Sequence, residues 1–348
     1  MTELISIIIA NYKDKRYIRH CVSSILKNTV YPNYEIIIVN YGWKKRLKVS
    51  DLTSHHRKRI LILNIPANVG YSSANMIGLK YAKGSLIALL NNDTIVTKEW
   101  LRHLYAVIKN DAKIAAVQSR LMLMDLPNRI DSIGHIIDPL GFLRAKGYLK
   151  RVQKMQSAIM EACIIQPAAC LVRRRVIDEI GLFCEEYFWG HEDTDFSLRA
   201  LICGYKLMVA LNSVVLHKRS ATLSHMPEPF IVYYSRRNIL MTILKNYQLR
   251  SLALILPVHL ALVTAMAIWY LYHNKPDCAI AVFRAISWNI KNIRKILKRR
   301  YAVQKLRRID DRTLFSYMDR INIHRILQNR KLGSLSTIHL KRVPSNEN

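Results

Sequence analysis

The chain has 348 residues, more than one average domain, and a formal net charge of +30. Its six cysteines stand singly, with neither a CxxC pair nor the spacing of a disulfide framework, which favours reduced thiols in the cytosol and argues against a zinc site. From Arg236 onward, 22 lysines and arginines stand against 5 acidic residues, a balance typical of a region that binds anionic phospholipid or nucleic acid. We therefore expect a catalytic domain over residues 1–245 and a helical, basic appendage over 246–348.

Strands and helices are predicted to alternate along the first 123 residues. Apolar, β-branched runs predict strands at Leu4–Ala10, Glu35–Asn40, Ile60–Ile65, Ser85–Leu90 and Ile114–Leu123. Helices are predicted at Arg16–Lys27, Ser72–Ala82 and Lys98–Lys109. This alternation indicates βαβ units, and so an α/β fold with a mostly parallel central sheet flanked by helices. The first three residues lack the basic region of a signal peptide, and we expect none there.

Two acidic clusters, about 100 positions apart, are the most informative feature of the sequence. Asp93 follows a strand that is too apolar to be exposed, and open α/β sheets bind ligands at the carboxyl ends of their strands. Glu192 and Asp193 lead into a helix-like stretch, Phe196–Cys203. One cluster suits a metal on a diphosphate and the other suits a general base, which together suggest group transfer from a nucleotide-activated donor.

Several short blocks follow one another in a definite order along the chain. They are Ser6–Tyr12, Asn68–Asn75, Leu90–Thr94, Ala169–Arg174, Gly181–Phe183 and Glu192–Arg199. This ordered set resembles the inverting family 2 glycosyltransferases of the GT-A fold. Tyr233–Asn238 resembles the end of the rhamnosyltransferase-like subgroup. Each block alone is a weak signal, whereas the ordered set over residues 4–240 is a strong one.

The resemblance implies a donor site for a nucleotide-sugar. The residues expected to bind the donor are Asn11, Tyr12, Asn40, Asn68, Gly70, Asn75, Asn91 and Asn92. Gly70 permits close backbone approach, and Ser72 or Ser73 can cap the following helix, whose N-terminus favours a diphosphate. Asp93 is the expected ligand of Mg²⁺ or Mn²⁺, and His217, at the end of a strand-like stretch, completes the metal shell in related enzymes. For both residues an ordinary strand-end role stays open.

On the acceptor side, the resemblance implies a carboxylate that removes the proton of the attacking hydroxyl. We expect Asp193 to be this base, and Glu192 stays open. Trp189 and Arg199 are expected on the acceptor side, although Trp189 suits lid packing equally well. Asp195 is better suited to stabilise the N-terminus of a helix.

The second strand departs from the family pattern. An Asp-Asn pair that usually holds the nucleobase or ribose is replaced by Asn40, Tyr41, Gly42 and Trp43. The amide of Asn40 keeps hydrogen-bonding capacity without the charge. The donor is therefore left open among dTDP-, UDP- and GDP-linked sugars.

The appendage carries two features that suit a membrane surface. Residues 251–272 have no formally charged side chain, and about 20 apolar residues suffice to cross a bilayer. Residues 288–300 place apolar side chains at helical spacing among cations, as in an interfacial amphipathic helix. Because basic groups flank 251–272 on both sides, we expect association with the cytoplasmic face of the membrane, with 251–272 in its plane or shallowly inserted. A true span and a buried core helix are the alternatives.

Three functional classes therefore compete. The first is an inverting, metal-dependent glycosyltransferase acting on a lipid-linked or cell-envelope glycan at an anionic membrane surface. The second is a nucleotidyltransferase, which should carry a glycine-rich loop after the first strand, whereas Asn11–Asp14 contains no glycine. The third is a basic nucleic-acid-binding protein, and no zinc, RRM or KH signature accompanies the charge, so we expect no nucleic-acid partner.

Overall fold

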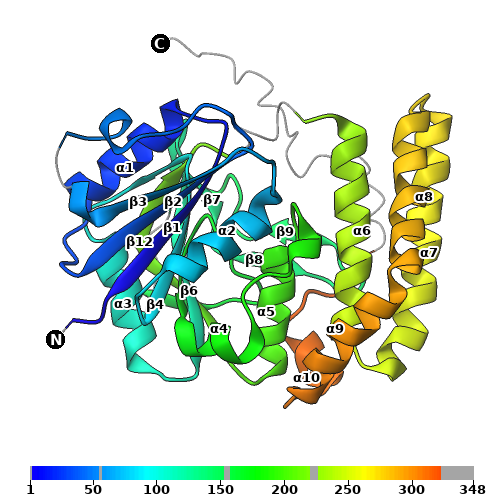
Figure 1. The fold of residues 1–348 in the computed structure, drawn as a ribbon. Coiled ribbons are helices and arrows are strands. Elements are labelled where there is room, and N and C mark those ends of the chain that lie inside the picture. Colours follow the sequence, from blue (N-terminus) through cyan, green and yellow to red (C-terminus); the bar gives the residue numbers. More distant parts are fainter. Residues whose placement is uncertain (1, 55–56, 153–156, 220–225, 323–348) are drawn as a thin grey trace, which may run out of the picture.

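The computed structural model describes residues 2–54, 57–152, 157–219 and 226–322, in which a central sheet is flanked by helices (Figure 1). Within these residues the main sheet runs, in spatial order, β10 (Ile159–Glu161), β12 (Lys206–His217), β6 (Ile114–Leu123), β11 (Ala169–Arg173), β4 (Leu86–Asn91), β1 (Ile5–Tyr12), β2 (Tyr34–Tyr41) and β3 (Ile60–Ile65). Two further strands pair beside this path, β5 (Thr94–Val96) with β12 and β7 (Leu126–Ser132) with β6.

The predicted α/β fold with a mostly parallel sheet is confirmed. Strands β3, β2, β1 and β4 run parallel to one another, and β6 runs parallel to β12. Strand β11 is the antiparallel insertion between β4 and β6. The β-branched runs suit these strands because the sheet is covered on both faces.

Two apolar cores lie on opposite faces of the sheet. On β1, Ile5, Ile7 and Ile9 belong to one core and Ile8 to the other, as the two-residue period of a strand requires. Helices α1 (Arg16–Asn28) and α3 (Trp100–Asn110) pack on the first face. The second face is covered by α2 (Gly70–Tyr81), α4 (Arg174–Ile180) and α5 (Glu192–Ile202).

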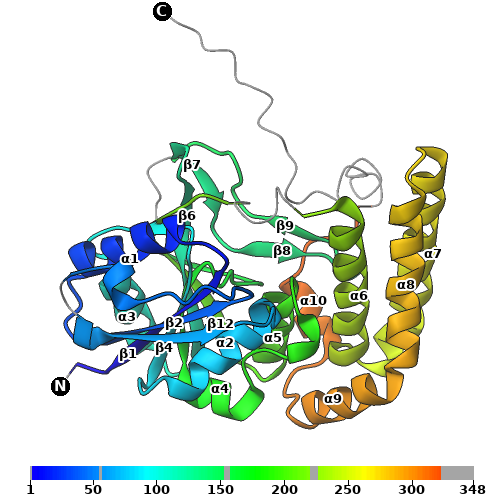
Figure 2. The same cartoon turned by 45° about the horizontal axis from the view of Figure 1, so that its top comes forward.

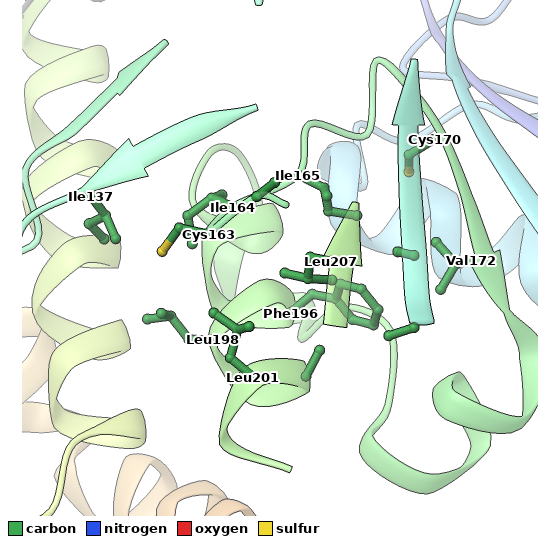
Figure 3. Close-up of a cluster of buried hydrophobic side chains, with 14 of the residues drawn as sticks. Ile137, Cys163, Ile164, Ile165, Cys170, Val172, Phe196, Leu198, Leu201 and Leu207 are labelled. Atoms are coloured by element: carbon green, nitrogen blue, oxygen red, sulfur yellow. The ribbon is translucent and has the colours of Figure 1, made fainter. Parts of the chain in front are cut away.

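Helix α5 is held by its apolar face. Figure 3 shows Phe196, Leu198 and Leu201 of this helix among buried side chains that include Leu207 of β12 and Val172 of β11. All five are at most 2% exposed. The packing leaves the first turn of α5, with its acidic residues, at the edge of the core.

A hairpin and three short 3₁₀ turns connect the larger elements around the sheet. They are the hairpin of β8 (His135–Ile137) and β9 (Leu143–Ala145), and the 3₁₀ turns η1 (Val49–Asp51), η2 (Arg57–Arg59) and η3 (Glu185–Tyr187). In Figure 2 the hairpin extends from the sheet toward the helices that follow it in sequence.

The C-terminal helices form a layer beside the sheet. They are α6 (Glu228–Asn246), α7 (Leu249–Tyr272), α8 (Pro276–Lys291), α9 (Ile293–Lys305) and α10 (Asp311–Ser316). In both views α6 lies between the sheet and the pair α7–α8 (Figures 1 and 2). Ile243 of α6 and Ile255 of α7 share the apolar core of α5, so the helical layer is continuous with the sheet. The division at residue 245 stays a prediction.

The sequence predicted one amphipathic helix over residues 288–300, but the structure has two helices there. Helix α8 ends at Lys291 and α9 begins at Ile293. Between them, the side chain of Asn292 donates to the carbonyl of Trp288. Asparagine is a weak helix former because its amide competes for backbone groups in this way.

Candidate active site

One large cavity, of about 870 Å³, lies where the carboxyl ends of β1, β2 and β4 meet the loop before α5 and the start of α6. Many of the predicted site residues line it: Tyr12, Asn68, Gly70, Asn91, Asn92, Asp93, Trp189, Glu192, Asp193 and His217. Residues from both acidic clusters therefore share one cavity.

Asp93 and His217 come together through strand pairing. Thr94 opposes His217 in the antiparallel register of β5 and β12, so the preceding Asp93 faces the imidazole. His217 Nε2 lies 3.3 Å from Asp93 Oδ1. Behind the ring, His217 Nδ1 is hydrogen-bonded at 2.7 Å to Oδ2 of Asp131, a buried residue of β7 that the sequence analysis missed.

Asp131 is held as an anion. Burial alone would raise the pKa of its carboxyl, but His217 and the guanidinium of Arg219 lower it below the ordinary value. Arg219 Nη1 lies 2.6 Å from Asp131 Oδ1, and this arginine also lines the cavity. Against burial, Asp93 and Asp131 raise the pKa of His217 to about 10.

The residues present fit a divalent cation on a diphosphate. A carboxylate that holds the far nitrogen of a histidine is the usual support of a metal-binding imidazole. Among the described residues no three or more His, Cys, Asp or Glu form a closed metal cluster. Asp93 and His217 are two ligands at an open cavity, and Mg²⁺-type sites commonly take one or two protein ligands and complete their shell with phosphate oxygens and water.

The second acidic cluster is positioned by an abrupt start of α5. His191 adopts a left-handed backbone with φ of 66°, and the helix begins at Glu192. Asp193 Oδ1 accepts the backbone N–H of Thr194 at 2.6 Å. Its Oδ2 lies 4.0 Å from Nδ1 of His135 on β8, a cavity residue that the sequence analysis did not identify.

The two acids differ in their electrostatic surroundings. Burial raises the pKa of Asp193 to about 6, and the hydrogen bonds from Thr194 oppose the rise. Burial and then the charge of Asp193 raise the pKa of Glu192 to about 8. Burial therefore raises the pKa of both carboxyls, and the charge of Asp193 adds to the rise at Glu192.

Beneath the donor end of the cavity lies a chain of amide side chains. Asn92 donates to Asn11, Asn11 donates to Asn40, and Asn40 donates to Asn64, at 2.8, 2.9 and 2.9 Å. Asn11 and Asn40 are fully buried and lie outside the cavity wall. Their predicted contact with the donor is therefore indirect, through Asn92 and the backbone that they hold. The cavity wall here consists of the Tyr12 and Tyr41 rings, 5.3 Å apart.

The turn into α2 is shaped by a contact within the protein. The prediction that Ser72 or Ser73 caps this helix is wrong. The helix begins at Gly70, so Ser72 and Ser73 lie inside its first turn, and the Ser72 hydroxyl has no hydrogen-bond partner. Gly70 has a φ of +78°, and a Cβ there would lie 2.5 Å from the carbonyl oxygen of Phe188. The glycine thus permits close approach of the loop before α5.

Two further predicted site residues, Asn75 and Arg199, lie away from the cavity. Asn75 is buried in α2 and donates to the carbonyl of Tyr71, one turn back. Arg199 was predicted on the acceptor side, but its guanidinium binds Asp195 and donates to the carbonyls of Ile180, Gly181 and Leu182. Because all these contacts are internal, Arg199 supports the fold beneath the acceptor side.

The block Tyr233–Asn238 anchors the loop that precedes α5. From α6, the Asn238 amide donates to the carbonyls of Tyr187, Trp189 and Gly190 at 3.0, 2.9 and 2.8 Å. Trp189 of this loop and Phe230 of α6 line the same cavity as Asp193, and their rings are 6.1 Å apart. The rhamnosyltransferase-like subgroup that this block indicates stays a prediction.

The chain is similar in sequence to several curated proteins. The chain is 24% identical over 230 residues to the O-antigen biosynthesis protein RfbC of Myxococcus xanthus, covering 62% of this chain and 17% of that protein. It is 32% identical over 110 residues to the glycosyltransferase GlyG of Streptococcus pneumoniae, covering 31% of this chain and 36% of that protein. The chain therefore matches only about a third or less of the length of these relatives.

Solved structures share the fold. GalNAc-T7 with UDP, GalNAc and Mn²⁺ has a TM-score of 0.59 at 16% identity, covering 83% of this chain and 57% of that one. The mannosyltransferase PcManGT of Pyrobaculum calidifontis, with GDP-Man and Mn²⁺, has a TM-score of 0.50 at 12% identity, covering 88% and 86%. The family model described as glycosyl transferase family 2 matches residues 6–181, just over half of the chain. With its ordered motifs and its α/β fold, the chain belongs to glycosyl transferase family 2.

Proposed function

We propose that the protein transfers a sugar from a nucleotide diphosphate to an acceptor hydroxyl, with inversion at the anomeric carbon. The observation that carries the proposal is the single cavity lined by Asp93 and His217 at one place and by Glu192 and Asp193 at another. A single displacement needs a leaving diphosphate and a base on opposite sides of the reacting carbon, and this arrangement supplies groups for both.

The diphosphate end belongs to Asp93 and His217. We infer that both bind Mg²⁺ or Mn²⁺, with Asp131 orienting the imidazole through its Nδ1 hydrogen bond of 2.7 Å. When bound, the cation neutralises charge on the departing nucleoside diphosphate. The similar structures of GalNAc-T7 and PcManGT, which contain Mn²⁺ with UDP or GDP-Man, support a divalent cation and a nucleotide-sugar donor.

The acceptor end belongs to Asp193. Because Thr194 holds Oδ1, the free Oδ2 is the atom that takes the hydroxyl proton. A C–O bond then forms at the anomeric carbon as its bond to the diphosphate oxygen breaks. The 4.0 Å between Asp193 Oδ2 and His135 Nδ1 is too long for a hydrogen bond, but an acceptor hydroxyl placed between them reaches both. His135 is then a positioning residue for that hydroxyl.

The nucleobase end is formed by Tyr12 and Tyr41. Their paired rings offer an aromatic surface, and the amide chain beneath them replaces the carboxylate expected from the family pattern. Rings tolerate any base, so dTDP-, UDP- and GDP-linked sugars all stay within the proposal.

The acceptor is proposed to be a lipid-linked or cell-envelope glycan, met at the cytoplasmic membrane surface. Helix α7 is long and apolar enough to cross a membrane by length and composition. Beyond Arg250 near its start, the exposed residues of α7 are apolar or aromatic: Ala253, Leu254, Pro257, Val258, Ala261, Ala265, Ile268, Leu271 and Tyr272. Soluble monomers rarely expose such a continuous patch. Because the opposite face of α7 packs on α6 and α8, a helix lying in the membrane plane fits better than a span.

A panel of nucleotide-sugars tests the proposal directly. We expect one donor class to raise the melting temperature, more strongly with Mn²⁺ than with EDTA, and Asp93→Ala to lose the Mn²⁺-dependent part while keeping the unliganded melting temperature. No stabilisation by any nucleotide-sugar would contradict the proposed donor. Equal stabilisation of the wild type and Asp93→Ala would contradict the metal site.

A further inference from the structure

Arg219 lines the candidate active site but takes no part in the proposed reaction. It follows the end of β12 by two positions and lies in the wall of the same cavity as Asp93 and His217. Lys13 is the other lysine or arginine among the described residues of this wall. Its Nζ lies over the ring of Tyr12, 5.2 Å from the ring centre, at the nucleobase end. The position of Arg219 then decides whether its charge serves the donor or only the fold.

The end of β12 directs His217 and Arg219 to one side and Lys218 to the other. Side chains alternate along an extended chain, so positions 217 and 219 share a side. Lys218 lies on the opposite side, where its Nζ is 2.7 Å from both carboxylate oxygens of the exposed Asp125. Its backbone N–H donates to the carbonyl of Asp93 at 2.9 Å, which keeps this segment beside the proposed metal ligand. Arg219 is thus held at the diphosphate end of the cavity.

Two side chains hold the guanidinium of Arg219 in place. Its Nη1 lies 2.6 Å from Oδ1 of Asp131, and its Cζ lies 4.1 Å from the ring centre of Tyr148. Asp131 belongs to β7, and Tyr148 precedes Leu149, whose backbone N–H donates to the carbonyl of Ile130 on the same strand at 2.9 Å. The backbone of Arg219 has a φ of 51°, and a residue other than glycine keeps such a conformation only where its surroundings hold it. The arginine is therefore fixed before any ligand binds.

The charges around the metal site give Arg219 a role beyond the fold. A divalent cation on Asp93 and His217 requires a neutral imidazole, and the carboxylates of Asp93 and Asp131 together cancel the two charges of the cation. Without Arg219 the site would therefore be neutral at the place where a diphosphate brings at least two negative charges. With Arg219, one positive charge remains for the donor.

A guanidinium can serve Asp131 and a phosphate at the same time. It carries five N–H groups in a planar fork, and this fork matches two oxygens of a phosphate. The side chain of Arg219 is 20% exposed and lines the cavity, whereas that of Asp131 is 1% exposed. A ligand in the cavity thus reaches the guanidinium but not the carboxylate beneath it.

We propose that Arg219 binds the phosphate oxygens of the donor's diphosphate, with Asp131 as the shared support of Arg219 and His217. When the bond between the anomeric carbon and the diphosphate oxygen breaks, its electron pair stays on that oxygen. The guanidinium stabilises the new charge by hydrogen bonds and keeps its own protons. The inference rests on the proposed function and adds a second cation to its diphosphate end. A part of the affinity for the donor is therefore independent of the metal.

Calorimetry with nucleotides tests the role of Arg219. UDP, GDP and dTDP, each beside its nucleoside, are titrated into the full chain in EDTA and with Mn²⁺. In EDTA, we expect the wild type to bind one diphosphate more tightly than its nucleoside. Arg219→Gln should weaken this diphosphate at least about tenfold, about 1.4 kcal/mol, and leave nucleoside binding unchanged. Lys218→Gln removes the neighbouring cation that points away from the cavity, and it should bind as the wild type does.

A second substitution separates contact with the diphosphate from charge balance. If Arg219 serves only to neutralise Asp131, Arg219→Gln should have no effect in the Asp131→Asn background. If Arg219 binds the diphosphate, a loss of several-fold or more should persist there, measured in EDTA so that metal binding does not contribute. The double variant leaves no buried carboxylate uncompensated, so its comparison with Asp131→Asn keeps the test decisive if Arg219→Gln alone does not fold.

Failure of this inference and failure of the proposed function give different results. Equal diphosphate binding by the wild type and Arg219→Gln, or no preference of the wild type for a diphosphate over its nucleoside in EDTA, would overturn the role of Arg219. Binding with Mn²⁺ that depends on Asp93 would then still support the donor site. No binding of any of the three diphosphates, with Mn²⁺ or in EDTA, contradicts the donor site itself.

Discussion

Asp193 and Asp195 lie two positions apart on α5 and have opposite surroundings. Asp193 faces the cavity, where burial raises its pKa to about 6. Asp195 faces inward, where Lys245 and Arg199 outweigh burial and hold its pKa far below the ordinary value. The same residue type therefore supplies a titratable base at one position and a permanent anion at the other.

The first prediction concerns the base. Asp193→Asn should lower kcat by at least about 10²-fold with little loss of donor binding, because the amide cannot take the hydroxyl proton. Initial rates and nucleotide binding measure the two effects separately. Glu192→Gln is the matched neighbour. If Glu192→Gln is inactive and Asp193→Asn is mild, the base is Glu192.

The pH dependence of the rate tests the same assignment. A base must be ionised, so activity should be low below the pKa of the base and rise as pH increases through it. With Asp193 as base, the acidic limb should have an apparent pKa near 6. A limb near 8 would instead report Glu192. The apparent values belong to the coupled pair, which makes the Glu192→Gln profile the necessary control.

The second prediction at the scale of single residues concerns Asp131. Asp131→Asn keeps the size of the side chain but weakens the hold on His217, so Mn²⁺-dependent nucleotide binding should weaken by about 10–100-fold. Titration of Mn²⁺ in the presence of a nucleoside diphosphate measures the effect. Asp125→Asn, which removes an exposed carboxylate paired with Lys218, is the control. Equal metal affinity in both variants would place Asp131 outside the metal site.

At the scale of elements, a buried ionic strut joins α5 to α6. Asp195 accepts from Arg199 on its own helix and pairs with Lys245 on α6, while Asn246 donates to it at 3.0 Å. Arg199 extends the strut to the carbonyls that end α4. The helix that carries Asp193 is therefore fixed on two sides by the same carboxylate.

Breaking that strut should cost stability. Asp195→Asn leaves two buried cations uncompensated, and we expect a loss of about 3–5 kcal/mol in the free energy of unfolding, measured by urea denaturation. Asp178→Asn, at an exposed position of α4, should change it little. The Asp195 contribution is complete above the unfolded carboxyl pKa, about 3.9, and is lost as pH falls below it. A loss near zero would mean that the charges are solvated.

The elements that the sequence predicted well are those fixed locally. The predicted strands Ile60–Ile65 and Ile114–Leu123 match β3 and β6, and each begins directly after a basic residue, Arg59 or Lys113. The start of α2 depends on the close approach of Gly70 to Phe188, 118 positions further along the chain, and no local pattern contains that contact. Boundaries therefore failed where another segment decided them.

The candidate site divides in the same way. Asp93 and Asp193 were found because each is flanked by a recognisable block. Asp131 and His135 lie in an irregular segment of the sequence. The pairing of β7 with β6 brings Asp131 to His217, and the β8–β9 hairpin brings His135 to the cavity. Arg199 was misplaced because a motif gives position along the chain and says nothing of which side of the helix faces inward.

For the whole molecule, the exposed stripe of α7 makes a prediction about the membrane. Replacing Leu254, Ile268 and Leu271 by serine removes apolar side chains that are 75%, 62% and 52% exposed, so folding should be little affected. Binding to vesicles of phosphatidylcholine and phosphatidylglycerol should fall, and the part that resists high salt should fall most, because salt screens only the cationic contribution. Co-flotation with vesicles measures both.

The control for that experiment is an exposed apolar residue elsewhere. Leu61→Ser, on the edge strand β3, removes a side chain that is 41% exposed and lies outside the stripe. It should leave flotation unchanged. If the triple variant floats as the wild type does, the stripe does not bind the membrane. If the variant changes from a dimer to a monomer, the stripe is an interface between two copies of the protein.

Asn238 has a consequence for the loop that precedes α5. Its amide carries two hydrogens but lies within hydrogen-bond distance of three carbonyls, those of Tyr187, Trp189 and Gly190. At any moment, therefore, at least one of the three carbonyls shares a hydrogen with another carbonyl or accepts none. The amide can exchange among the three while it stays hydrogen-bonded to the loop. A single side chain of α6 therefore sets the position of the backbone on both sides of Trp189, and its loss would release three carbonyls at once.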